Sequence, residues 1–130
     1  MRTIGTLLIL LLLAPLPAHA QRVATARLVD AGGRPVGEAH LTQTPHSGVL
    51  IHLRLHNLPA GVHAFHVHAV GRCEGPDFES AGPHLNPAAR AHGLLVADGP
   101  HAGDMPNVYV GPDGTLEAEL VAARLSLRRR

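Results

Sequence analysis

Residues 61–104 read GVHAFHVHAVGRCEGPDFESAGPHLNPAARAHGLLVADGPHAGD, and this stretch determines how the rest of the chain is interpreted. It begins with a His-x-x-His-x-His pattern and continues into a loop that is rich in glycine and proline, carries three more histidines and ends at Asp104. Six of the eleven histidines of the chain lie in this stretch. Because neutral imidazoles and an anionic oxygen are the ligands of transition-metal sites, the stretch predicts a metal centre.

The spacing of the histidines divides them into two candidate ligand sets. The first set has separations of eight, nine and three residues and consists of His84, His92, His101 and Asp104. Three imidazoles and one carboxylate suit tetrahedral zinc, and because no coordination position stays open, such a site is structural. The second set, His66 and His68, is incomplete and suits copper if further nitrogen ligands join it. The alternative is a histidine-rich loop without defined coordination.

Short segments in which apolar and polar residues alternate lie on both sides of this loop. Alternation with a period of two is typical of strands that bury one face, and it is clearest at 49–55. Clusters of Gly, Pro, Asn and Asp separate the segments as turns. We therefore expect an all-β sandwich or barrel, with strands at 23–28, 36–44, 49–55, 62–70, 107–110 and 115–121.

The fourth of these expected strands carries both core and ligand candidates. Alternation sends Phe65 and Val67 toward the core together with His63. It sends His66 and His68 to the opposite face, where two imidazoles can grip one ion. We expect His63 to be buried and satisfied by backbone hydrogen bonds. The remaining histidines of the predicted domain have no neighbours that complete a coordination set, so we expect them on the surface: His40, His46, His52 and His56.

The segment 71–106 has no usable period and contains five prolines. A loop of this length in a small domain is usually functional or disordered. We expect metal coordination to supply the order that a hydrophobic core does not supply here.

The first twenty residues have the features of a secretory signal peptide. Arg2 gives a positive start, residues 7–13 are rich in leucine, and Ala18-His19-Ala20 fits the cleavage rule before Gln21. A membrane anchor is the alternative, but the apolar run is short and two prolines interrupt its end. We therefore expect a signal peptide at 1–20, one mature domain at 21–130, and export, which in a Gram-negative bacterium means the periplasm.

Charge and cysteine usage limit the partners. The chain has 130 residues, a formal net charge of +1, no lysine and one cysteine, Cys73. Exported chains normally pair their cysteines, so an unpaired Cys73 is informative. Three arginines at 128–130 are too few for a nucleic-acid patch, and we interpret them as a solvated tail. We expect no nucleic-acid partner, and no membrane association after signal cleavage.

At its histidine motifs the sequence strongly resembles the copper/zinc superoxide dismutase family. The matching segments are GVHAFHVH at 61–68, SAGPHLNP at 80–87, HG at 92–93 and HAGD at 101–104. The resemblance implies the family's Greek-key β-barrel with a long metal-binding loop. It also implies the ligands: copper at His66 and His68, zinc at His92, His101 and Asp104, and His84 as the imidazolate that bridges the two metals.

The resemblance further implies an activity. Family members disproportionate superoxide to dioxygen and hydrogen peroxide by redox cycling of copper. His84 would be the catalytic residue, serving as ligand and as proton donor, and zinc would tune its basicity. The expected cofactors are one copper and one zinc ion per chain, the expected substrate is superoxide, and a homodimer is left open.

The chain also departs from the family pattern. The family places its fourth copper histidine, its guiding arginine, an acidic residue that links the metal sites and the cysteine that pairs with the Cys73 position downstream of the region matching 116–127. No histidine follows His101 in this sequence. We therefore expect the last one or two family strands to be missing. Three hypotheses follow: a secreted dismutase with full or weak activity, a non-enzymatic periplasmic zinc and copper binder, or a truncated fragment with little activity.

Overall fold

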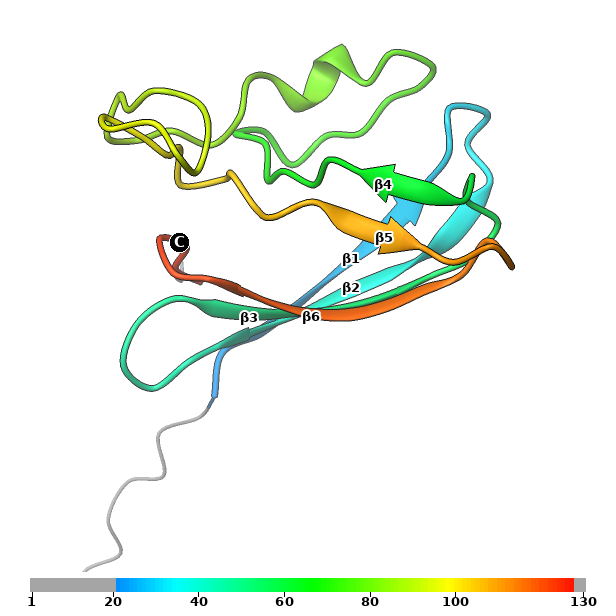
Figure 1. Cartoon of the computed structure of the whole chain (residues 1–130), viewed down its shortest axis with the longest axis horizontal. Coiled ribbons are helices and arrows are strands. Elements are labelled where there is room, and N and C mark those ends of the chain that lie inside the picture. Colours follow the sequence, from blue (N-terminus) through cyan, green and yellow to red (C-terminus); the bar gives the residue numbers. More distant parts are fainter. Residues whose placement is uncertain (1–20, 128–130) are drawn as a thin grey trace, which may run out of the picture.

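The computed structural model describes residues 21–127 (Figure 1). The expected signal peptide at 1–20 and the arginines at 128–130 lie outside the described residues. Six strands and one short helix follow one another along the chain: β1 (Val23–Val29), β2 (Pro35–Gln43), β3 (Val49–Leu55), β4 (Gly61–His63), η1 (Glu79–Ala81), β5 (Val108–Val110) and β6 (Leu116–Ala122).

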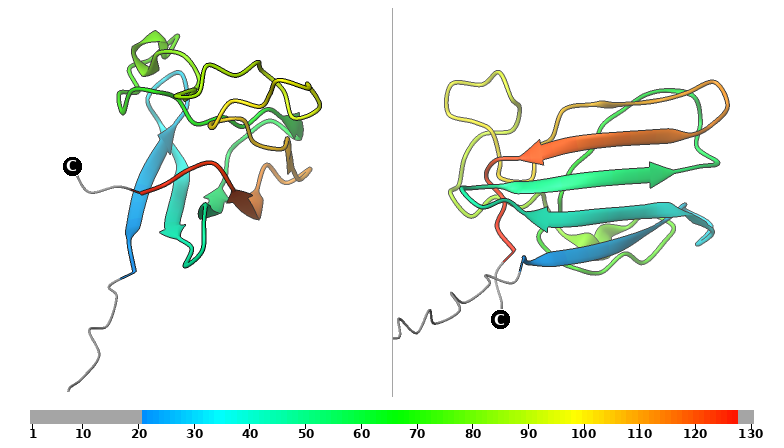
Figure 2. Two further views of the ribbon diagram at one scale, coloured as in Figure 1. Left: turned by 90° about the vertical axis from the view of Figure 1, so that its left-hand side faces the viewer. Right: turned by 90° about the horizontal axis from the view of Figure 1, so that it is seen from below.

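Four strands form an antiparallel sheet in the order β1-β2-β3-β6. The right panel of Figure 2 views this sheet face-on. The alternation seen in the sequence sorts its side chains as expected, because successive residues of a strand point to opposite faces. On β3, Val49, Ile51 and Leu53 are at most 1% exposed, whereas His52 and Arg54 lie on the outer face.

A second, two-stranded sheet pairs β4 with β5 and packs over the inner face of the first. Val110 on β5 is fully buried and belongs to the same apolar cluster as β3. Phe65 and Val67 pack against that cluster, as the alternation predicted. The all-β prediction is confirmed, and the two layers form a sandwich-like arrangement that does not close into a barrel.

One strand boundary was predicted wrongly. The strand expected at 62–70 ends at His63, and beyond it only His66 and His68 form isolated bridges, to Asp104 and His84. The backbone of Val67 bonds to two loop segments instead of continuing a ladder with β5. Tertiary contacts therefore replace the sheet at this point.

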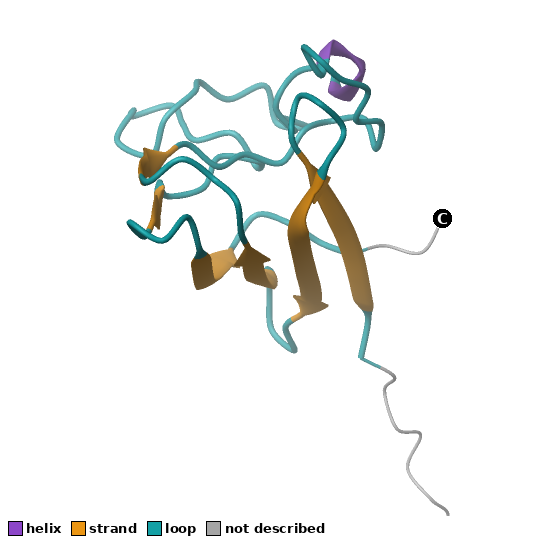
Figure 3. Ribbon diagram, turned by 90° about the vertical axis from the view of Figure 1, so that its right-hand side faces the viewer, coloured by secondary structure: helices purple, strands orange, loops and turns teal. Residues whose placement is uncertain are grey.

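The long segment between β4 and β5 is mostly loop, as expected, and lies on the side of the small sheet away from the large one (Figure 3). Its regular structure is limited to η1, a single 3₁₀ turn. Cys73 lies on this loop, exposed and unpaired. Among residues 21–127 there is no helix with the length and apolar character needed to cross a membrane.

The turn between β1 and β2 is organised by Asp30. Its carboxylate accepts hydrogen bonds from the backbone N–H of Gly32 and Arg34, both at 2.9 Å, and from the Arg34 guanidinium at 2.7 Å. The Arg34 backbone and side-chain hydrogen bonds lower the pKa of Asp30 below its ordinary value. The ionised form of Asp30 is therefore the form that holds the turn.

This turn predicts a pH-dependent contribution to stability. A carboxyl whose pKa is lower in the folded state stabilises the fold at pH values above its unfolded pKa of about 3.9, and the contribution fades as the pH falls through the folded pKa. Asp30→Asn should therefore lower the Tm at pH 7, and the difference from the parent should shrink below about pH 4 and disappear once the pH lies below the folded pKa of Asp30. Thermal unfolding followed by circular dichroism at several pH values measures this; Asp98→Asn, at an exposed loop position, is the control. An equal Tm loss at every pH would contradict the assignment.

Candidate metal centre

Three loop segments are tied together by a closed set of backbone hydrogen bonds. The N–H of Val67 donates to the carbonyl of Gly103 at 2.9 Å. The N–H of Gly103 donates to the carbonyl of Leu85 at 2.9 Å, and the N–H of Leu85 donates to the carbonyl of Val67 at 2.8 Å. We call this set the backbone triangle. Each corner adjoins a candidate ligand in sequence, so the triangle brings His66, His68, His84 and Asp104 to one place.

Asp104 is the centre of the cluster, and its side chain is only 2% exposed. One carboxylate oxygen, Oδ2, accepts hydrogen bonds from the backbone N–H of Gly93 at 2.9 Å and of His101 at 3.1 Å. The other oxygen, Oδ1, faces three imidazoles. The carboxylate is thus held in one orientation by the backbone, with Oδ1 left for the histidines.

Opposing influences act on the charge of Asp104. Burial is the largest of them and raises the pKa, but the hydrogen bonds from Gly93, His101 and His84 outweigh it. The pKa of Asp104 is consequently well below its usual range. The cluster therefore contains an ionised carboxylate at neutral pH, as a metal ligand must be.

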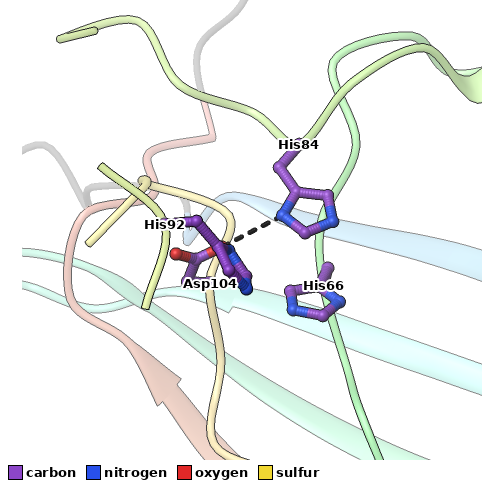
Figure 4. A group of neighbouring side chains, drawn as sticks. All are labelled: His66, His84, His92 and Asp104. Atoms are coloured by element: carbon purple, nitrogen blue, oxygen red, sulfur yellow. Dashed lines mark hydrogen bonds and ion pairs between the residues drawn. The ribbon is translucent and has the colours of Figure 1, made fainter. Parts of the chain in front are cut away.

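The Nδ1 atoms of three histidines converge on Oδ1 of Asp104 (Figure 4 draws two of these rings). The Nδ1–Oδ1 distances are 3.2 Å for His84, 3.1 Å for His92 and 3.3 Å for His101. Donor atoms around a tetrahedral zinc ion with bonds of about 2.0–2.1 Å are separated by about 3.3 Å, which is the spacing found here. Each histidine and the carboxylate therefore have the donor types and the separation of two ligands of one zinc ion.

One buried nitrogen in this group makes no hydrogen bond. This atom is Nδ1 of His101. A buried polar atom without a partner carries a cost of about 1–3 kcal/mol, which a bound ion would remove. The residues present therefore fit a cation at this position.

His66 and His68 approach the same cluster from the other side of His84. The ring of His66 stacks on His84 with centroids 4.0 Å apart, and the ring of His68 meets His84 edge-on at 5.1 Å. Burial is the largest influence on the pKa of His66 and lowers it, and the nearby His84 ring lowers it further. This favours neutral His66, which is the form that binds metals.

A backbone carbonyl fixes the orientation of His68. Its Nδ1 lies 2.7 Å from the carbonyl oxygen of Gly82. Because a carbonyl can only accept a hydrogen bond, we assign the hydrogen to Nδ1, which leaves Nε2 with a free lone pair. His68 and His92 are the exposed members of the cluster.

The structure thus brings together all six candidates from the sequence. His66, His84, His92 and Asp104 have ligand atoms within 4.8 Å of one another; His101 joins them through Asp104, and His68 through His84. His63 lies apart and is only half-buried, but its Nε2 does bond to a backbone carbonyl, that of Pro59, at 2.7 Å. The surface histidines are on the outer sheet face or in turns, as expected: His40, His46, His52 and His56.

Sequence reasoning missed the backbone groups that hold the site. The N–H of Gly93 and the carbonyl of Gly82 each adjoin a recognisable motif, but no local pattern assigns them a partner. Their partners are eleven and fourteen residues away in the chain. Only the folded loop defines these contacts.

The backbone triangle predicts a strict requirement for glycine at position 103. A Cβ at Gly103 would collide with the carbonyl oxygen of Val67 and lie 3.1 Å from the amide nitrogen of Leu85. Gly103→Ala should therefore separate the segments and weaken zinc binding by at least about tenfold, since outer contacts of metal ligands commonly contribute that much.

The matched control is Gly71→Ala, because a Cβ there meets no atom within 4 Å. Zinc affinity is measured by competition with a chromophoric chelator, and folding by far-ultraviolet circular dichroism. Equal zinc affinity for both variants would show that the triangle does not position the ligands.

The family model described as copper/zinc superoxide dismutase matches residues 36–130. Over 112 residues the chain is 44% identical to copper/zinc superoxide dismutase 1 of Aquifex aeolicus, covering 85% of this chain and 66% of that protein.

Two solved structures share the fold. A superoxide dismutase-like protein from Bacillus subtilis superposes with a TM-score of 0.76 at 36% identity, covering 81% of this chain and 70% of that one. The copper/zinc superoxide dismutase from Brucella abortus gives a TM-score of 0.69 at 26% identity, covering 82% and 75%. The chain spans 60–66% of the length of three curated relatives that it matches.

Proposed function

Because the chain belongs to the copper/zinc superoxide dismutase family, we propose that it disproportionates superoxide at the cluster around His84. The family uses copper and zinc, and this chain has a His/Asp group able to bind metal. In the reaction, one superoxide anion loses an electron and leaves as dioxygen. A second gains that electron and, with two protons, leaves as hydrogen peroxide.

Zinc would be held by the group around Asp104. Its four ligands would be Nδ1 of the three histidines that face Oδ1, and the carboxylate itself: His84, His92, His101 and Asp104. The hydrogen bonds from Gly93 and His101 to Oδ2 support this assignment, because they hold the carboxylate while Oδ1 faces the ion. The set is complete, so its role would be structural.

Copper would be held by His66, His68 and His84. The observation that carries the proposal is the double position of His84: its Nδ1 lies 3.2 Å from Asp104, and its ring also lies against His66 and His68. The two nitrogens of an imidazole lie on different edges of the ring. With Nδ1 directed at Asp104, Nε2 is left for the side of the other two histidines.

When bound, copper supplies the reversible one-electron chemistry that disproportionation requires. The protein residues contribute position and protons. When its Nε2 is free of metal, His84 would hold a proton there and donate it as peroxide forms, while the ring stays oriented with Nδ1 toward Asp104. Because His68 is exposed, a small anion has access to this side of the cluster.

A non-enzymatic metal-binding role is the second candidate. Asp104 is buried and accepts hydrogen bonds from Gly93 and His101, whereas on the other side His68 is exposed and its Nδ1 donates to one carbonyl. A chain with this asymmetry could retain zinc without turning over superoxide. The name of the Bacillus subtilis protein, superoxide dismutase-like, is consistent with either role.

The activity predicts a specific loss at position 84. Purified protein is loaded with both metals, freed of loose copper by a chelating resin and assayed for superoxide decay, with metal content measured by mass spectrometry. His84→Ala should slow decay by about 100-fold or more, because it removes both a ligand and the proton donor. His56→Ala, at an exposed position, should match the parent. If the copper-loaded parent is no faster than zinc-only protein, the enzyme is rejected in favour of the metal binder.

We also propose that the chain is exported to the bacterial periplasm, on the basis of residues 1–20. Expression of the full chain in a Gram-negative host should yield periplasmic protein whose first residue is Gln21. Osmotic shock followed by N-terminal sequencing measures this. Ala18→Asp should block cleavage, because the processing site needs small residues. Cytoplasmic protein that retains Met1 would contradict export.

A further inference from the structure

The outer face of the four-stranded sheet carries a second arrangement of histidines and carboxylates, remote from the loop. It is the face turned toward the viewer in the right panel of Figure 2. His40 on β2 and His52 on β3 are direct cross-strand partners. In the next row along the same face, Glu38, Arg54 and Glu117 are partners across β2, β3 and β6.

We propose that His40 and His52, with the carboxylates of Glu38 and Glu117, form a second binding site for a divalent transition-metal ion such as Zn²⁺. We call these four residues the outer-face site. Imidazole nitrogen and carboxylate oxygen are ligands that zinc accepts. The site lies across the core from the cluster around Asp104 and is independent of the proposed dismutase function.

Two halves of the outer-face site are already formed. Nε2 of His40 lies 3.4 Å from Oε2 of Glu38, and Nε2 of His52 lies 3.2 Å from Oε1 of Glu117. Donors around tetrahedral zinc are separated by about 3.3 Å, so each pair has the spacing of two ligands of one ion.

The sheet register brings the two halves within reach of each other. Directly opposed residues of an antiparallel pair have Cβ atoms about 4.5–5.5 Å apart, so the rings of His40 and His52 are neighbours. Among the described residues, only the buried cluster has three or more donors within 4.8 Å of one another. The outer-face site must therefore close by side-chain rotation. The side chains have room for this, because those of Glu38, His40 and Glu117 are 46–66% exposed and that of His52 is 27% exposed.

Two arginines oppose metal binding at this site. Arg27 on β1 lies 3.9 Å from Oε1 of Glu38, and the guanidinium of Arg54 donates to Oε1 of Glu117 at 3.0 Å. Removing the charge of Arg54 frees Glu117 and lowers the repulsion of a cation. Glu119, the cross-strand partner of His52, adds a negative charge beside the site. A set of ordinary surface ion pairs would show no such response of metal affinity to Arg54.

The test is a zinc titration of the full chain by calorimetry. Protein loaded with copper and zinc at the cluster around His84 is dialysed against metal-free buffer and then titrated with Zn²⁺. We expect about one further ion per chain. His40→Gln and His52→Gln should each weaken this uptake by at least about tenfold, whereas Arg54→Gln should tighten it. His56→Gln, at an exposed position outside the site, is the matched control.

Three results would overturn the outer-face site. They are no further zinc uptake by the parent, unchanged uptake in both histidine variants, or equal loss in His56→Gln. Two single histidine variants are used so that poor folding of one, judged by circular dichroism, leaves the other informative. Since superoxide decay is not the readout, failure here leaves the proposed dismutase function untouched.

Discussion

The backbone triangle of Val67, Gly103 and Leu85 is the constraint on which the metal centre depends. Several apolar side chains of the loop stay exposed, among them Leu94, Leu95 and Val96, so the hydrophobic effect alone does not order it. Three closed hydrogen bonds join residues from three segments, and two of these residues, Val67 and Leu85, also pack against the core. The triangle thus transfers the rigidity of the sandwich to a loop that would otherwise have none.

The carboxylate of Asp104 extends this order to the ligands. Its burial would be unfavourable by itself, since an ionised carboxylate in an apolar interior is costly unless it is hydrogen-bonded. The amides of Gly93 and His101 meet that need. The protein therefore accepts a buried charge before any ion is bound, and the loop conformation follows from satisfying it. Folding of the loop and the proposed coordination therefore rely on the two oxygens of the same carboxylate.

Much of this could be predicted from the sequence, because the relevant signals are local. The period of two at 49–55 identified the most buried strand, and the spacing of histidines identified the six residues that the structure brings together. The end of β4 at His63 was not predicted. Alternation continues through His66 and Val67, but the partner strand that would extend the ladder is replaced by loop segments.

Contacts between residues that are far apart in the sequence were also not predicted. His40 and His52 lie side by side because of the register of β2 with β3, and the orientation of His68 depends on the carbonyl of Gly82. Neither follows from residue type or period. The sequence also predicted that His63 is buried, but it is half-exposed. The predicted hydrogen bond to the backbone is present, to the carbonyl of Pro59. The hydrogen bond of His63 to a backbone carbonyl could be predicted from the sequence, whereas its degree of burial could not.

The unequal exposure of the cluster has a kinetic consequence. The Asp104 side chain is 2% exposed and that of His101 18%, whereas that of His92 is 57% exposed and His68 lies at the surface. A competing chelator would reach His68 and His92 long before it reached Asp104. Ions on the His68 side would exchange quickly with their surroundings, while an ion bound to Asp104 would exchange more slowly, because the carboxylate and the His101 side chain are largely buried. The same cluster would then have one labile and one long-lived position, set by depth more than by ligand chemistry.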